Sequence, residues 1–236
     1  MNYFLFFILG SITGIAVFRY ISTFIENIKL SIYQSYTELF PHNLLPFSSE
    51  QSILQPKKCG HSFVYLLGFA LFFIYCLIVN QSILLSLWWA YYGTLLFTIS
   101  LVDWQYQLIS PNLCRAIFVL NIIGSYFNLN ELSLEESILS SFSAFSIFYV
   151  IYYIAKWIYK KEVLGRGDYW LMLGLGGIIY WENLPLLIFI ASFTASLYGL
   201  YQKIKLKSGK FLPFAPFLCC ANLIMLYIQF NYLMAR

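Results

Sequence analysis

The sequence has few charged residues, and from Cys59 to Val102 it has none. Only 10% of its 236 residues are Asp, Glu, Lys or Arg, whereas 61% are hydrophobic and 21% are aromatic. This composition excludes an ordinary soluble globular protein. A helix needs roughly 20 apolar residues to cross a bilayer, so the uncharged run alone predicts two spans. The sequence therefore predicts an all-α, polytopic membrane protein.

The first apolar run lacks a basic residue on its N-terminal side, and the first basic residue, Arg19, follows it. A secretory signal has the reverse order, so we expect an uncleaved first span with its N-terminus outside. The polar breaks predict a single membrane-embedded domain, 1–236, with a cytoplasmic or interfacial loop at about 20–61. About eight transmembrane helices are expected, at residues 3–18, 62–79, 83–102, 113–129, 137–155, 169–181, 184–201 and 211–233.

The distribution of positive charge agrees with this topology. The four segments expected on the cytoplasmic side contain 13 of the 14 Lys and Arg residues, which satisfies the positive-inside rule. The net charge of +4 is too small to indicate a nucleic-acid partner. The lysines at 203–210 instead predict contact with anionic lipid. The four segments expected on the cytoplasmic side are residues 19–61, 103–115, 156–168 and 202–210.

The chain has only two aspartates, Asp103 and Asp168, and the topology places both at the cytoplasmic face. Two carboxyls held together in a partly dry site cannot both ionise easily. One then serves as a base that activates water and the other as an acid that polarises a carbonyl, as aspartic peptide hydrolysis requires. Alternatively, each aspartate only caps a helix. Asp168 precedes a span and suits that role, but Asp103 follows one, where the helix dipole disfavours a negative charge.

The segment that leads to Asp168 contains the other candidate site residues. Gly165 and Gly167 would let the backbone approach closely on either side of Arg166. Glu162 either helps to position this glycine stretch or forms a solvent-exposed pair with Lys160 or Arg166. Arg166 itself is interpreted as one of the positive-inside residues.

Four segments carry a resemblance to a known family. They are Gly10-Ser11 with Val17-Phe18-Arg19; Leu101-Val102-Asp103 with Leu108-Ile109 and Pro111-Asn112; Glu162 with Gly165, Gly167 and Asp168; and Pro213-Phe214-Ala215-Pro216. In this order they resemble the GS…YR, D…LLPD, E…GxGD and PFGP signatures of type IV prepilin leader peptidases, which are GxGD membrane aspartic proteases. The resemblance covers nearly the whole chain.

The resemblance implies a bacterial inner-membrane peptidase with its active site at the cytoplasmic face and Asp103 and Asp168 as its catalytic residues. Its substrates would be type IV prepilins or pseudopilins, from which it removes a short basic leader. Proteolysis would need no cofactor. Many members also N-methylate the new N-terminus with S-adenosylmethionine. The partners would be these substrates and the lipid bilayer, and the oligomeric state stays open.

Several positions depart from the family pattern. The family's cytoplasmic loop usually carries two CxxC pairs that bind zinc, but here only Cys59 remains, with His42 and His61 nearby, which argues against zinc. Thr13-Gly14 stands where the first signature has Asn, which leaves methylation open. Trp170 replaces a common Lys.

Two alternatives to the peptidase stay open, and the departures favour only the first. One is a non-catalytic, pilin-binding paralogue of the same fold. The other is a small transporter with the aspartates as a proton relay, but that function would place the carboxylates near mid-membrane.

Overall fold

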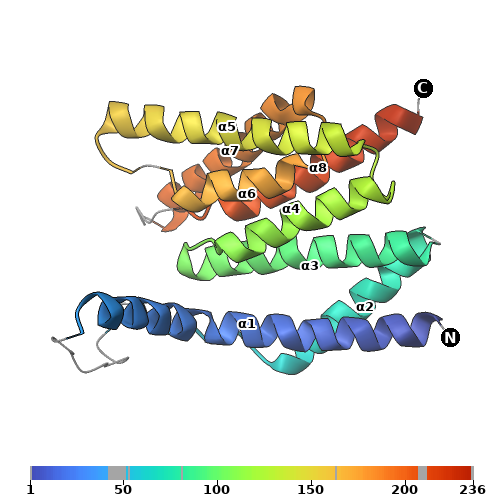
Figure 1. Cartoon of the computed structure of the whole chain (residues 1–236), viewed down its shortest axis with the longest axis horizontal. Helices are drawn as coiled ribbons and strands as arrows, with labels where there is room; N and C mark the ends of the chain where they lie inside the picture. Colours follow the sequence, from blue (N-terminus) through green and yellow to red (C-terminus); the bar gives the residue numbers. More distant parts are fainter. Residues whose placement is uncertain are drawn as a thin grey trace. The chain divides into compact units, whose positions relative to one another are not determined.

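The computed structural model describes residues 2–41, 52, 54–80, 82–162, 164–206 and 212–234, so the prediction for His42 lies outside the described residues. All regular elements in these ranges are helices, and the predicted all-α class is confirmed (Figure 1). The α-helices are α1 (Asn2–Leu39), α2 (Ser62–Asn80), α3 (Ile83–Tyr106), α4 (Pro111–Tyr126), α5 (Leu134–Tyr159), α6 (Arg166–Gly176), α7 (Leu184–Tyr201) and α8 (Ala215–Met234). A 3₁₀ turn, η1 (Trp181–Asn183), precedes α7, and a π turn, η2 (Gln202–Leu206), follows it.

The helices confirm a polytopic membrane protein. Five of them are long and apolar enough to cross a membrane: α1, α2, α3, α5 and α7 with its flanking turns. The apolar stretch of α8 is shorter. The helices α4 and α6 have 16 and 11 residues, so α6 is only about 16 Å long and cannot cross a hydrocarbon core of about 30 Å by itself.

The first helix is much longer than its predicted span, 3–18. It has 38 residues and a length of about 57 Å, so residues 19–39 continue a helix within the segment expected as a cytoplasmic or interfacial loop. Its buried residues Val17, Ile21, Phe24 and Ile25 recur three or four positions apart. This spacing puts them on one face, which gives the helix a reason to continue past Arg19.

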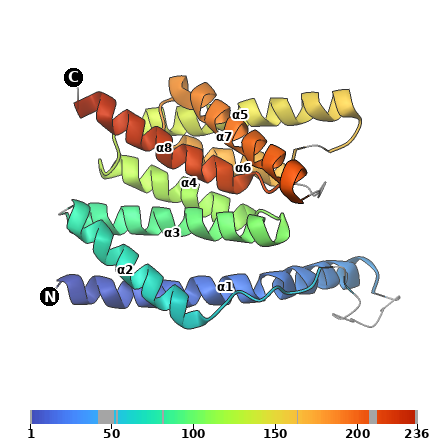
Figure 2. The same cartoon turned by 180° about the vertical axis from the view of Figure 1, so that it is seen from behind.

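The chain divides into two compact units, Met1–Ala90 and Tyr91–Arg236, and the boundary falls within α3. In the first unit, α1 packs closely against α2 (Figure 2). A Cβ on Gly10 would lie 2.6 Å from the Phe69 carbonyl oxygen, and one on Gly14 would collide with the carbonyl oxygen of Tyr65. Gly10 belongs to the first motif, and its lack of a side chain is what permits this backbone approach.

In the second unit, α6 packs against α4, α5 and α8, and Figure 1 shows it between neighbouring helices. The last carbonyls of a helix have no partner within it, and a buried helix end needs other donors. Asn121 Nδ2 donates to Gly174 O at 2.8 Å, Asn222 Nδ2 to Leu175 O at 3.1 Å and Ser137 Oγ to Gly177 O at 2.6 Å. Three polar side chains therefore hold α6, which ends at Gly176 rather than at the predicted Trp181.

Candidate active site

Both predicted catalytic residues lie at one end of the second unit. Asp103 is in the last turn of α3 and Asp168 in the first turn of α6, and Figures 1 and 2 show these helix ends, with the start of α8, on the same side. Both residues are buried, with exposed fractions of 4% and 5%. The basic residues at the ends of α5 and α7 share this end, whereas Glu131, Glu135 and Glu136 precede or begin α5 at the other.

Asp103 is held by a residue far away in the chain. The backbone N–H of Ala215, the first residue of α8, donates to Asp103 Oδ2 at 3.0 Å. The start of a helix carries partial positive charge and unpaired N–H groups, so it favours a carboxylate. Asp103 was expected just after a helix, where its charge would be disfavoured. It lies inside the last turn of α3 and is stabilised by the N-terminus of α8.

Asp168 is held by its own turn. The backbone N–H of Gly165, which precedes α6, donates to Asp168 Oδ2 at 3.0 Å, so Asp168 forms the side-chain half of a capping box. Both aspartates therefore accept a hydrogen bond at a helix start: Asp168 at the start of its own helix, α6, and Asp103, in the last turn of α3, at the start of α8. Capping does not exclude catalysis, because only one oxygen of each carboxyl is used.

The glycines beside Asp168 permit two close approaches. A Cβ on Gly167 would lie 2.5 Å from the Cβ of Ile109, which belongs to the connection between α3 and α4. A Cβ on Gly165 would lie 3.1 Å from Asp168 Oδ2. The first distance is impossible for a real side chain, so the GxGD segment packs against the segment that follows Asp103 only because residue 167 is glycine. The second is tight, so glycine at 165 leaves room for the Asp168 carboxyl itself.

The two carboxyls form an electrostatic pair. Ile109, six residues after Asp103, meets Gly167 directly before Asp168, so the two carboxyls lie on segments in contact. Both carboxyls are buried, and in a site with little water the ionisation of the second carboxyl costs the most free energy. Such a pair favours the state with one carboxylate and one carboxylic acid, which can supply a base and an acid at the same place.

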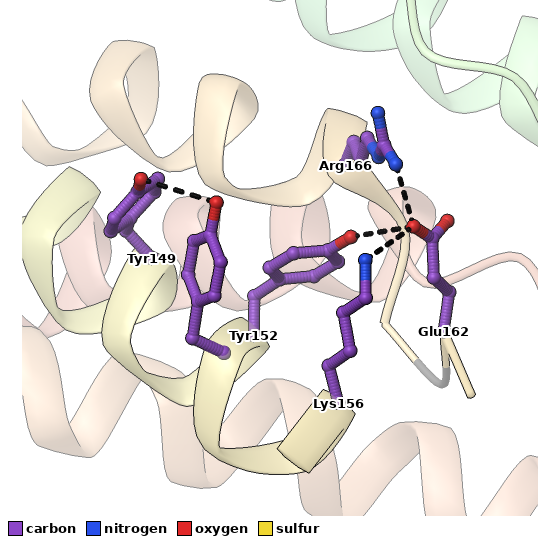
Figure 3. Close-up of polar contacts among 6 residues, drawn as sticks. Tyr149, Tyr152, Lys156, Glu162 and Arg166 are labelled. Carbon is purple, nitrogen blue, oxygen red and sulfur yellow. Dashed lines mark hydrogen bonds and ion pairs between the residues drawn. The ribbon is translucent and has the colours of Figure 1, made fainter. Parts of the chain in front are cut away.

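Glu162 lies in the turn between α5 and α6 and accepts three hydrogen bonds (Figure 3). Its Oε1 accepts from Arg166 at 2.7 Å, Tyr152 at 2.9 Å and Lys156 at 3.1 Å. These donors lower the pKa of Glu162 to about 2, with Arg166 as the largest cause. The expected pairing with Arg166 is confirmed, and the further basic partner is Lys156. Sequence reasoning missed Tyr152, although its position one turn before Lys156 offered a signal.

The remaining candidates lie outside this pair. Trp170 is partly exposed, and its ring contacts that of Phe145 on α5. Cys59 is half-buried and His61 is exposed. Among the described residues no three His, Cys, Asp or Glu side chains gather as a metal site would need.

Two buried aspartates at neighbouring ends of two helices in a membrane protein suit the chemistry of a membrane aspartic peptidase. The model of the type IV leader peptidase family matches residues 90–200, a range that includes both aspartates and Glu162. A prepilin leader peptidase/N-methyltransferase of Haemophilus influenzae is 40% identical over 230 residues, which cover 98% of this chain and 99% of that protein. The chain belongs to the type IV leader peptidase family.

More distant relatives match a smaller part. A prepilin leader peptidase/N-methyltransferase of Legionella pneumophila is 29% identical over 146 residues, 61% of this chain and 48% of that protein. One from Vibrio cholerae is 26% identical over 164 residues, 69% of this chain and 62% of that protein. No solved structure matches this chain. The family membership makes the chain a peptidase of the membrane aspartic type.

Proposed function

We propose that the chain removes the leader peptide of type IV prepilins or pseudopilins, with Asp103 and Asp168 as the catalytic carboxyls. The observation that carries this proposal is the pair of buried aspartates at one end of the second unit, in which each carboxyl is oriented by a backbone N–H at a helix start. The substrate class is supported by the 40% identical relative, whose printed name is that of a prepilin leader peptidase/N-methyltransferase.

The pair supplies both proton-transfer groups that amide hydrolysis needs. The ionised carboxyl takes a proton from water as the water oxygen bonds to the scissile carbonyl carbon, and the protonated carboxyl gives its proton to the carbonyl oxygen. The tetrahedral intermediate then collapses. The C–N bond breaks, and the proton taken from water passes to the departing amine. Gly165 and Ala215 hold one oxygen of each carboxyl, so the other oxygen of each remains for water and substrate.

The position of the pair suits a substrate that is itself a membrane helix. We infer that the active site faces the cytoplasm in the bacterial inner membrane. The inference is supported by Lys156, Lys160, Lys161 and Arg166, which lie at the same end of the second unit as the aspartates. A prepilin helix beside this unit would present the peptide bond at its cytoplasmic end, where the basic leader begins.

The test is cleavage of a prepilin by the full-length protein in membranes. Asp103→Asn and Asp168→Asn keep the side-chain shape but remove the titratable group, and each is expected to abolish cleavage at unchanged membrane level. Glu131→Gln is a matched control, because it removes one carboxylate at the opposite end of the unit and should leave cleavage unchanged. If the wild-type protein cleaved neither prepilins nor pseudopilins from the same cell, the proposed peptidase function would be wrong and the pilin-binding paralogue would be favoured.

N-methylation of the new N-terminus is a second proposed activity. It is supported by the names of the relatives, which include N-methyltransferase. Two surface hollows, between α3 and α4 and between α1 and α2, are lined mostly by apolar residues with Arg115 and Arg19 at their edges. Neither offers the acidic groups that a sulfonium cation would favour, so no step is assigned to S-adenosylmethionine. Mass spectrometry of the cleaved product tests for an added methyl group.

A further inference from the structure

Glu162, in the turn between α5 and α6, is hydrogen-bonded to one buried tyrosine of α5, Tyr152. Tyr152 is 4% exposed and lies two turns before the end of α5. Its hydroxyl donates to Glu162 Oε1 at 2.9 Å, and Figure 3 shows it directed toward the same oxygen as Lys156 and Arg166. Tyr152 is thus the buried member of a network whose other members are exposed.

The exposed members cannot hold the turn by charge alone. Lys156 and Arg166 keep 44% and 66% of their side-chain surface in solvent, and exposed ion pairs contribute little to stability. A hydrogen bond to an ionised carboxylate is stronger than one between neutral groups, and the Tyr152 side chain that donates it is itself fixed by burial. Glu162 also accepts from Arg166, the first residue of α6, so it connects the Tyr152 hydroxyl to the start of that helix.

The ring of Tyr152 also touches the other side of the aspartate. It packs edge-on against the ring of Tyr169, with centroids 5.8 Å apart and an interplanar angle of 67°. Arg166 lies two residues before Asp168 and Tyr169 directly after it. Tyr152 thus contacts Glu162, which precedes Asp168 in the chain and binds Arg166, and Tyr169, which follows Asp168 directly.

We propose that Tyr152 is a positioning residue, which fixes the first turn of α6, and with it the Asp168 carboxyl, by binding Glu162 on one flank and Tyr169 on the other. This inference rests on the proposed peptidase function. It goes beyond that function in assigning the alignment of the pair to a residue of α5. A misplacement of about 1 Å in a catalytic group can cost about 100-fold in rate, so the hydroxyl has a measurable role.

The experiment compares two tyrosines of the same helix. Tyr152→Phe keeps the ring and removes the hydroxyl. Tyr149→Phe is the matched control: Tyr149 lies one turn earlier, its ring also packs on Tyr169 at 5.7 Å, but its hydroxyl is bonded to Tyr153 at 3.3 Å (Figure 3). Prepilin cleavage by each purified full-length variant in detergent is measured as separate kcat and KM values.

Tyr152→Phe is expected to lower kcat about tenfold while KM stays within about twofold, and Tyr149→Phe to leave both unchanged. Glu162→Ala should lower kcat by a similar factor. Glu162→Gln keeps an acceptor oxygen for the hydroxyl and should retain most of the wild-type kcat. Because Glu162 is exposed, its variants remain informative if Tyr152→Phe accumulates poorly. The double variant Tyr152→Phe/Glu162→Ala should be no slower than either single variant, since both break one connection.

Equal kcat values for the two Phe variants would overturn the inference, and so would independent, multiplying losses in the double variant. These outcomes are distinct from failure of the proposed function. In that case the wild type itself would not cut, or Asp103→Asn and Asp168→Asn would still cut.

Discussion

The two aspartates of the candidate site are held in opposite ways. Asp168 takes its backbone hydrogen bond from Gly165, three residues away, whereas Asp103 takes its own from Ala215, 112 residues away. Both bonds measure 3.0 Å, and both use an N–H at the start of a helix. One half of the pair is therefore determined by its local sequence, and the other exists only when α8 is docked beside α3.

The contact between the two halves gives the largest expected effect. In Gly167→Ala the new Cβ would lie 2.5 Å from the Cβ of Ile109, so one of the two segments must move. We expect cleavage to fall by about 100-fold or more. Ile109→Ala should not rescue it, because alanine keeps the Cβ, but Ile109→Gly should restore part of the activity. Rates come from the prepilin cleavage assay.

Gly68→Ala in α2 is the control for this change, since nothing lies within 4 Å of its added Cβ. It should leave activity intact and stabilise the helix by up to about 1 kcal/mol, because alanine is the better helix former. Wild-type activity in Gly167→Ala would show that the contact has no role.

The long-range hydrogen bond to Asp103 is removed when Ala215 loses its backbone N–H. Proline is well accepted as the first residue of a helix, so Ala215→Pro deletes the donor to Asp103 with little cost to α8 itself. We expect a loss of cleavage of roughly tenfold to 100-fold, because Asp103 loses one hydrogen bond and its orientation. Ala215→Gly keeps the N–H and should remain active. A thermal unfolding curve in detergent separates this effect from a loss of folding.

A change beside Asp168, at Gly165, should lower cleavage less than the loss of the Ala215 N–H. In Gly165→Ala the Cβ would lie 3.1 Å from Asp168 Oδ2, a distance that a shift of a few tenths of an ångström relieves. We expect kcat to fall by roughly threefold to tenfold, since the backbone N–H is still in place. If this variant were slower than Ala215→Pro, the local contact would be the more demanding of the two, which reverses the comparison.

The smallest effect concerns pH. The bonds from Arg166, Tyr152 and Lys156 lower the pKa of Glu162 from its ordinary 4.5 to about 2. A lowered pKa means that the network is fully present above the ordinary pKa and is lost only as the pH falls through the lowered one. The ratio of wild-type to Tyr152→Phe activity should therefore be constant from about pH 5 to about pH 8. A ratio that drifts across this range would point to a titrating group other than Glu162.

The sequence predicted more of the local features than of the contacts between distant segments. The GxGD segment, the start of α6 and the pairing of Glu162 with Arg166 lie within a few residues of one another, so residue types and spacing were enough. The partner of Asp103 was missed because the helix that supplies it starts more than a hundred residues later. The extension of α1 past Arg19 was missed because charged residues such as Glu26 and Lys29 obscured the apolar face that continues it.

By itself, the sequence determined the all-α membrane class and the family, and it singled out the two aspartates as the predicted catalytic residues. Hydrophobic run length and charge placement reflect the cost of putting polar groups in lipid, and that cost is paid residue by residue. Only the tertiary structure decided that Ala215 holds Asp103, that Ile109 meets Gly167 and that Tyr152 reaches Glu162. These contacts depend on close packing and hydrogen-bond geometry between separate helices, which no single segment specifies.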